Sequence, residues 1–527
     1  MYKIFFTYIS FFTILFSSCS KDIGNYDYQE MNSLYIVGID NRYERRADDS
    51  ISIIPIIVER IGDNEEGFSY EWLRLVPASD FVALFDYEVF STERNLTSLE
   101  GLGLGENTVY YRVTAAKGIK YTSYKFAIAI RSDLNAGFMV LSEINEEGRL
   151  DFVSFGQDQF YPIYDLPSRI GLDLPTIYKP LQIEIFRHTT GPNAGIIPGY
   201  ATNIFLFSKS APEVFDPITF DNSDERFNSQ LWFPASPANI SFDGIVVPSV
   251  GSGMLYLFAD DNLYYSCLTP AYSVLWNYTL PINKLGATGE LFKFSKWIAL
   301  GSHGAIFDTE TRSFYQHRQG SLNCQKYSEN RDNVLFPYLN MNHNLVFSRA
   351  VVRTIGGVAN SRAFAVLDSI PNHEKTLAIF DLDTGEQDLF GKINGPEIEK
   401  ATDFAIDPYL GTFLYYLSED KTKVYQYNIG LASSAKEVYK AAPGSKISLI
   451  KPMGKSMGTS QGPVWSQNYL MICTIDENLP DGSNGTLEVF NVEDMINGGL
   501  EPSVIAGATA KWGGFGKIVN VDFKASN

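Results

Sequence analysis

From Leu134 onward the chain repeats one pattern, and this repeat limits the choice of fold more than any other feature. Each copy holds an apolar strand, a turn, and a second strand that ends in acidic residues or glycine. The copies follow one another at somewhat over fifty residues, close to the ~40–50 residues of a four-stranded propeller blade. Seven copies are found, at 137–155, 202–220, 253–268, 296–318, 362–393, 412–430 and 468–493.

The end of the chain supplies a strand that has no partner in its own repeat. Further apolar strands are predicted before the third, fifth, sixth and seventh copies, at 244–250, 344–352, 401–407 and 446–453. The first copy lacks such a strand, whereas GKIVNVDFK (516–524) is one with no strand pair after it. We expect this last strand to complete the first sheet, because a closed circle of sheets leaves fewer open edges.

The pattern therefore predicts an all-β fold, with a seven-bladed β-propeller over residues 134–527 that is closed by the C-terminal strand. Six or eight blades remain as alternatives, because some strands are weak in the sequence. A second pair of β-sandwiches is the other architecture considered, but it does not explain the unpaired last strand.

Residues 31–132 show a different pattern, with short alternating strands separated by Gly, Asn and Asp turns. About 100 residues of this kind fit one Ig/PKD-like β-sandwich. Trp72 takes the place of the core tryptophan on a middle strand, and Gly118 lies in the turn of the last hairpin. The strands are predicted at 50–61, 69–75, 107–116 and 121–132.

The N-terminus reads as an export signal that ends in a cysteine. Residues 1–18 carry one charge, Lys3, then an apolar run and small residues, as a secretory signal does. A transmembrane anchor is the alternative, but the run is well short of the roughly 20 residues needed to span a bilayer. LFSSC (15–19) resembles the lipobox of bacterial lipoproteins, which implies that Cys19 carries a lipid and that residues 19–30 form a tether.

The start of the mature chain is similar to a known family. The stretch KDIGNYDYQEMNSLYIVGID (21–40), followed by the predicted sandwich, resembles the PKD-like lipoproteins of Bacteroidetes. That resemblance implies an accessory protein of a nutrient-uptake locus, beside a SusC-like TonB-dependent transporter and a SusD-like lipoprotein. Residues 20–22, Ser-Lys-Asp, partly resemble the signal that sends such lipoproteins to the outer face of the outer membrane, so we expect a lipid-anchored protein facing the exterior.

The charge and cysteine content of the chain exclude several classes of binding partner and site. The chain has 42 basic and 61 acidic residues, which argues against nucleic acid or an anionic membrane surface, since both need basic patches. Beyond Cys19 there are three widely spaced cysteines and no CxxC pair, which excludes a zinc ribbon. Cys267 and Cys473 lie in apolar runs and are predicted to be buried small hydrophobic residues.

Motifs for catalysis, cofactors and metals are not found in the sequence. No metal is predicted, because the five histidines form no HExxH, HxH or HxxxH set. No G-x-S-x-G elbow or P-loop occurs, so no catalytic residue and no cofactor is predicted. The loop 476–488 is the best calcium candidate, but a plain hairpin loop is the favoured interpretation. The glycine-rich stretch 101–107 is interpreted as a turn.

Three tryptophans in Gly-, Pro- and Ser-rich stretches between strands are the candidate ligand-binding residues: Trp232, Trp465 and Trp512. An aromatic face can stack on a sugar ring or hold an apolar peptide side chain, although packing at a blade end is the favoured interpretation of these residues. The long loop 454–465 is the other candidate, because loops longer than a connection needs are often functional.

The sequence thus leads to a main hypothesis with two alternatives. The main one is a non-catalytic surface lipoprotein that binds oligosaccharide or oligopeptide ligands or docks onto a SusC/SusD-type transporter. A propeller polysaccharide lyase or glycoside hydrolase is the first alternative, and a purely structural assembly subunit is the second. Fold alone does not decide among them.

Overall fold

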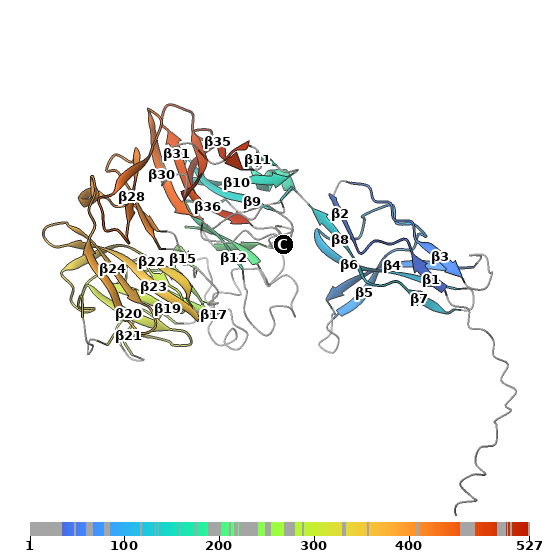
Figure 1. Cartoon of the computed structure of the whole chain (residues 1–527), viewed down its shortest axis with the longest axis horizontal. Helices are drawn as coiled ribbons and strands as arrows, with labels where there is room; N and C mark the ends of the chain where they lie inside the picture. The colour runs from blue at the N-terminus through green and yellow to red at the C-terminus, as the bar shows by residue number, and fades with distance from the viewer. Residues whose placement is uncertain are drawn as a thin grey trace, which may run out of the picture.

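The computed structural model describes residues 34–524 with gaps. The gaps are 47–48, 60–66, 78–84, 116–117, 132, 135, 157–158, 173, 175, 188–201, 210–211, 216–219, 221–240, 248–253, 268–279, 287–288, 329–333, 356–357, 407–410, 454–468, 493–501, 503 and 506–507. In the described part strands dominate, and helix is confined to short segments such as α2 (Leu166–Ile170) and η3 (Ile398–Lys400). Figure 1 shows two bodies, joined by the short stretch between β8 and β9.

The N-terminal region consists of two sheets. The larger runs in the order β2-β8-β6-β4-β5, with β7 also paired to β6, and the smaller is β1-β3. Within it, β2 and β8 pair in parallel, and the other pairs are antiparallel. The strands are β1 (Leu34–Val37), β2 (Arg42–Arg46), β3 (Ile56–Glu59), β4 (Ser69–Pro77), β5 (Phe85–Ser91), β6 (Gly105–Thr114), β7 (Lys120–Thr122) and β8 (Phe126–Arg131).

One apolar cluster forms the core of this region, and Trp72 lies within it as predicted. The Trp72 side chain is fully buried, its ring centroid lies 4.5 Å from that of Tyr111, and its Nε1 donates to the Glu93 carbonyl over 2.8 Å. Gly118, with φ of 78°, lies in the turn between β6 and β7 as expected. Residues 101–104 form the turn into β6, which confirms the interpretation for this part of the stretch, whereas residues 105–107 already belong to the strand.

Two predicted strands of the N-terminal region are shorter than expected. The strand predicted at 50–61 is reduced to β3 and an isolated bridge between Ile53 and Leu96. Pro55 lies between them, and proline has no N–H to donate to a ladder. The strand predicted at 121–132 divides into β7 and β8, and Ser123 bridges the break because its hydroxyl accepts from the Tyr111 N–H over 2.9 Å.

The C-terminal region contains, in its described residues, seven sheets of three or four strands that follow one another along the chain. They are β9 (Gly137–Ile144), β10 (Glu147–Gly156), β11 (Gln159–Ile163) and β36 (Lys517–Lys524); β12 (Pro180–Arg187), β13 (Thr202–Ser208) and β14 (Pro212–Phe215); β15 (Phe242–Val246), β16 (Met254–Ala259) and β17 (Asn262–Cys267); β18 (Ala299–Leu300), β19 (His303–Asp308), β20 (Ser313–Arg318) and β21 (Cys324–Lys326); β22 (His343–Ile355), β23 (Val358–Ser369), β24 (Lys375–Asp381) and β25 (Gln387–Lys392); β26 (Phe404–Ile406), β27 (Phe413–Leu417), β28 (Lys423–Asn428) and β29 (Lys436–Lys440); and β30 (Ser445–Pro452), β31 (Tyr469–Asp476), β32 (Gly485–Asn491) and β35 (Lys511–Phe515).

Strands are present at each of the seven predicted repeats and at the four predicted preceding segments. The loop from Asp476 to Gly485 connects β31 to β32 and is closed by its own hydrogen bonds, such as Asp476 N–H to Asn484 carbonyl over 2.9 Å. The hairpin interpretation of this loop is therefore confirmed. Cys473 on β31 is buried, as predicted, and the side chain of Cys267 lies outside the described part.

Buried apolar clusters join each sheet of the C-terminal region to the next one in the chain. A further cluster joins the last sheet to the first, and it contains Leu487 of β32 together with Phe138 of β9. The C-terminal strand β36 pairs antiparallel with β9, from Lys517 opposite Glu143 to Lys524 opposite Gly137. Figure 1 shows the red β36 beside β9 and β10.

His317 on β20 is a buried histidine that packing explains. Its Nδ1 accepts from the Tyr256 hydroxyl over 2.7 Å, and its Nε2–H donates to the Ser321 carbonyl over 2.9 Å. A carbonyl can only accept, so the neutral ring carries its proton on Nε2. Burial lowers the pKa of His317 from 6.5 to about 4. This histidine therefore links the third and fourth sheets in its neutral form.

We expect acid to destabilise the protein through His317. Between pH 6.5 and 4 the unfolded chain binds a proton at this site that the folded chain does not, so stability is full above pH 6.5 and is lost as pH falls toward 4. The loss is about 3 kcal/mol at this group. Urea unfolding at pH 7 and pH 4.5 should show that His317→Gln removes this component of the pH dependence. His373→Gln, at an exposed site, should retain it, and equal pH dependence of both variants would contradict the assignment.

Candidate functional site

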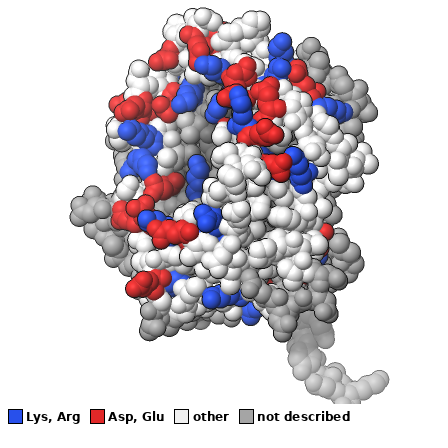
Figure 2. Space-filling view, turned by 90° about the vertical axis from the view of Figure 1, so that its left-hand side faces the viewer, with Lys and Arg blue, Asp and Glu red and all other residues white. Residues whose placement is uncertain are grey.

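A cavity of about 440 Å³ in the C-terminal region collects residues from all seven sheets. Its walls come from β36, β12, β15, β18, β22, β26 and β30, together with residues next to them, and we call these the lining strands. Each of them is the end strand of its sheet. Figure 2 shows a hollow on one face of the molecule, with basic and acidic side chains interspersed around it.

The same irregularity recurs in five of the described lining strands. The pairing of β12, β15, β22, β30 and β36 with the neighbouring strand shifts register by one residue. The skipped residues are Leu181, Asp243, Val346, Ser448 and Val519. All but Val346 line the cavity. A β-bulge redirects a side chain and is common beside functional sites. Because the bulge recurs at the same place in successive sheets, it places residues from several repeats at the cavity.

One side of the cavity is ionic. Lys451 of β30 contacts Glu184 of β12 over 2.9 Å and the Asn520 side-chain oxygen of β36 over 3.0 Å. Gln182 donates to the same Glu184 carboxylate over 3.0 Å. The Lys451 and Glu184 side chains are only 12% and 10% exposed. A nearly buried ion pair needs such extra hydrogen bonds to offset its desolvation, and this network connects the seventh, first and second sheets.

The other side of the cavity is aromatic. Trp297, just before β18, has its ring centroid 5.2 Å from that of Phe347 on β22, which in turn lies 6.2 Å from Phe404 on β26. The Lys296 ammonium lies 5.2 Å from the Trp297 ring. Beside these rings the Ser348 hydroxyl is buried with no hydrogen-bond partner among the described residues. Such a group is costly unless water or a ligand satisfies it.

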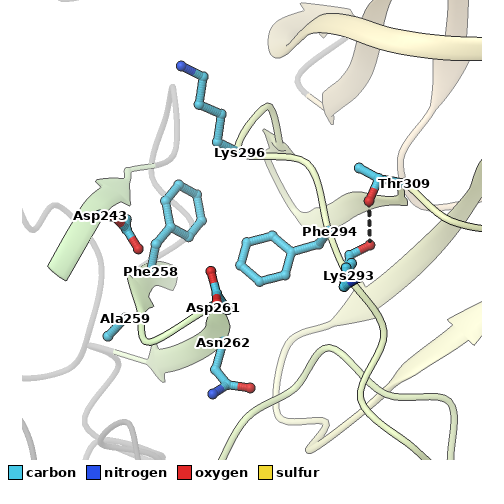
Figure 3. A pocket seen from close by; sticks show the side chains of 9 residues that line it. All are labelled: Asp243, Phe258, Ala259, Asp261, Asn262, Lys293, Phe294, Lys296 and Thr309. Carbon is cyan, nitrogen blue, oxygen red and sulfur yellow. Dashed lines mark hydrogen bonds between the residues drawn. The ribbon is translucent and has the colours of Figure 1, made fainter. Parts of the chain in front are cut away.

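A second pocket, of about 600 Å³, lies between the third and fourth sheets and shares Asp243, Phe258 and Lys296 with the cavity. Figure 3 shows the Phe258 and Phe294 rings with the Asp261 carboxylate reaching between them. The two ring centroids are 5.6 Å apart at 48°. We call this the side pocket, and it opens next to the cavity because the two share a wall.

Of the three candidate tryptophans, only Trp512 lies within the described residues. Trp512 was expected in a loop, but it lies in strand β35, is 8% exposed and packs against Phe138 and Phe160. That placement is wrong, and a core position leaves no free face for a ligand. The glycines that made its surroundings look like a loop permit close strand packing instead, since a Cβ on Gly516 would lie 2.8 Å from the Glu143 carbonyl oxygen of β9. Trp232, Trp465, the loop 454–465 and Cys19 lie outside the described residues.

The residues that the cavity does bring together were not singled out from the sequence. Trp297 precedes β18, is half-buried and lines the cavity. Glu184, Lys451 and Asn520 are far apart in the chain, so no local motif marks them. The only sequence signal for the cavity was the apolar strand that precedes a repeat. Strands at the same place in successive sheets lie around a common axis, so their residues are candidates for lining a shared cavity.

The described residues show neither a cluster of metal ligands nor a membrane-spanning helix. They contain no group of three or more His, Cys, Asp or Glu side chains that could hold a metal ion. Nor do they include a helix with the length and apolar character needed to cross a membrane.

Comparison with known families finds one match. Residues 19–175 match the PKD-like family. The match covers the N-terminal region and continues through β9, β10 and β11 of the first C-terminal sheet. No curated protein matches the chain.

Solved structures show only distant similarity. Hydrazine synthase of Kuenenia stuttgartiensis is 10% identical, with 60% of this chain and 78% of that chain covered and a TM-score of 0.33. Hsv2 of Kluyveromyces lactis is 10% identical over 67% of this chain and 93% of its own, with a TM-score of 0.33. The Dos1 propeller is 10% identical over 60% and 69%, with a TM-score of 0.31. These similarities carry no information about function.

Proposed function

We propose that this chain is a non-catalytic, lipid-anchored protein of the outer membrane that binds an oligosaccharide or oligopeptide at the cell surface. Cys19 carries the lipid, residues 20–30 are the tether, and the N-terminal region raises the C-terminal region above the membrane. The observation that carries the binding role is the cavity, which has an aromatic side and an ionic side. Sugars and peptides combine apolar faces with polar edges, and such a cavity suits both.

The architecture in this proposal is a seven-bladed β-propeller closed by the C-terminal strand. Three observations support it. Seven sheets follow one another in the described residues, a buried cluster joins each neighbouring pair including the last and first, and β36 pairs with β9. One cavity lined from every sheet is what a circular arrangement produces at its axis. Closure also removes sheet edges that would otherwise be open.

Binding is favoured over catalysis by how the ionic groups in the cavity are engaged. The Glu184 carboxylate accepts from both Lys451 and Gln182, and Asp403 pairs with Lys421 over 3.2 Å. Groups held in this way have fixed positions, and fixed hydrogen-bonding groups orient a ligand. The proposal therefore gives these side chains the role of recognising polar ligand groups.

The partners in this proposal are a SusC-like TonB-dependent transporter and a SusD-like lipoprotein, as the resemblance of residues 21–40 implies. The protein would pass its ligand to that complex. Affinity purification from detergent-solubilised membranes tests this part, with co-purification of a TonB-dependent transporter as the expected result. Recovery of the protein alone in repeated purifications would contradict it.

Filling the cavity should abolish ligand binding. Val519, the bulge residue of β36, is half-buried and lines the cavity, so Val519→Trp places an indole in it. Glycan and peptide mixtures screened by calorimetry should show a ligand whose affinity falls more than tenfold in this variant. Val334→Trp, at a site that is 50% exposed, should bind as the unaltered protein does. Equal binding by both variants would overturn the cavity as the binding site, and no binding of any mixture would overturn the function.

A further inference from the structure

The side pocket presents an unusual combination of groups for a surface recess. Its floor holds the rings of Phe258, which is nearly buried, and Phe294, which is partly buried. Three carboxylate or amide side chains, Asp243, Asp261 and Asn262, lie around these rings. Apolar contact at the floor and negative charge at the wall together suit a ligand group with an apolar stem and a cationic end.

Of the two carboxylates that line the side pocket, Asp261 is the one without a salt-bridge partner among the described residues. Asp243 pairs with Lys209, and the lining residue Lys293 pairs with Glu310 over 2.7 Å. Asp261 makes no salt bridge with any residue in the described part of the chain. Asp261 lies in the two-residue turn between β16 and β17. The neighbouring turn residue, Asp260, holds the turn in place, because its carboxylate accepts a hydrogen bond from the Ser241 N–H over 2.9 Å. The turn therefore does not use the Asp261 side chain.

The view in Figure 3 gives the positions of these groups. The Asp261 carboxylate reaches between the two phenylalanine rings, while the Lys296 side chain extends away from them. A cation that contacts Asp261 thus lies beside aromatic rings, and a cation near an aromatic face is attracted by the ring quadrupole. The basic lining residues have other partners: the Lys293 ammonium, although it lies within electrostatic range of Asp261, pairs with Glu310 over 2.7 Å, and the Lys296 ammonium lies 5.2 Å from the Trp297 ring.

We propose that the side pocket binds the arginine or lysine side chain of an oligopeptide. This inference rests on the proposed function and chooses the peptide among its two ligand classes. Neutral sugars carry no cation for Asp261, whereas the methylene stem of arginine or lysine packs on Phe258 and Phe294 while its charged end meets the carboxylate. Because the pocket shares Asp243, Phe258 and Lys296 with the cavity, one peptide spans both.

The test uses three blocked tripeptides, acetyl-Ala-Arg-Ala-amide, acetyl-Ala-Gln-Ala-amide and acetyl-Ala-Glu-Ala-amide, titrated into the full chain by NMR or calorimetry. The arginine peptide should bind at least tenfold more tightly than the other two, and its affinity should fall as salt screens the charge. Asp261→Asn should reduce its affinity about tenfold, to that of the glutamine peptide. Glu386→Gln, which removes one negative charge from an exposed turn of another sheet, should leave the affinity unchanged.

The outcomes separate this inference from the function on which it rests. Equal affinity for the three peptides, or no effect of Asp261→Asn, overturns the side pocket as a site for a basic residue. If Val519→Trp still abolishes binding of a glycan or peptide in that case, the cavity and the proposed function stand. An equal loss in Asp261→Asn and Glu386→Gln means attraction by the net negative charge of the chain, which also overturns the pocket.

Discussion

A chain that ends at Gly516 is expected to lose the cooperative fold of its C-terminal region. Such a chain lacks β36, whose Ile518, Val521 and Phe523 side chains are at most 4% exposed. Burial of each contributes about 1.5–3 kcal/mol, so their joint loss is comparable with the roughly 5–15 kcal/mol that stabilises a typical domain. The Ile185 N–H also loses its acceptor, the Asp522 carboxylate at 2.6 Å.

Urea unfolding followed by near-ultraviolet circular dichroism measures this effect. The control is a chain that ends at Lys524, which keeps β36 and removes only three residues. It should unfold like the full chain, whereas the shorter one should show no cooperative transition from the C-terminal region. A stability within about 1 kcal/mol of the full chain, a difference typical of surface changes, would show that β36 does not hold the first and last sheets together.

Trp72→Ala is expected to unfold the N-terminal region and to leave the C-terminal region intact. The Trp72 side chain is fully buried among Tyr111 and Phe126, and its Nε1 has a backbone acceptor. Truncating a buried tryptophan costs about 3–5 kcal/mol, a large share of the stability of a region of this size. The cluster that contains Trp72 includes no residue of the C-terminal sheets, so the loss should stay local.

Hydrogen exchange read by mass spectrometry distinguishes the two regions in one experiment. In Trp72→Ala, amides of β4, β6 and β8 should exchange rapidly, and those of β9 through β32 should exchange as before. Tyr124→Ala, which truncates a 94% exposed side chain of the same region, should change neither. Faster exchange in both regions would mean that they fold as one unit.

The sequence was sufficient to predict strands in each of the seven repeats of the C-terminal region, because each repeat places apolar residues in runs bounded by turn residues. It did not predict β12 or β35. The unpaired strand at 516–524 also pointed to β9, since a strand without a partner needs an edge to pair with. These signals are local in the sequence. They agree with the structure because burial of the same apolar residues stabilises each sheet.

The site could not be predicted in the same way. The glycines around Trp512 looked like a loop, but Gly514 allows a close approach to Tyr164 and Gly516 a close approach to Glu143, and both of these residues are far away in the chain. The ionic network joins Glu184, Lys451 and Asn520, which come from three different sheets. Their positions in the sequence form no motif that would predict their contact. Residues that gather by tertiary packing alone are visible only once the sheets are placed.

A crystal structure of residues 31–527 with a bound ligand would test whether the C-terminal region is a closed propeller whose cavity is the binding site. We expect seven sheets around one cavity, β36 paired with β9, and ligand density between Trp297 and Lys451. Density for the ligand elsewhere, or a C-terminal strand that does not pair with β9, would contradict it.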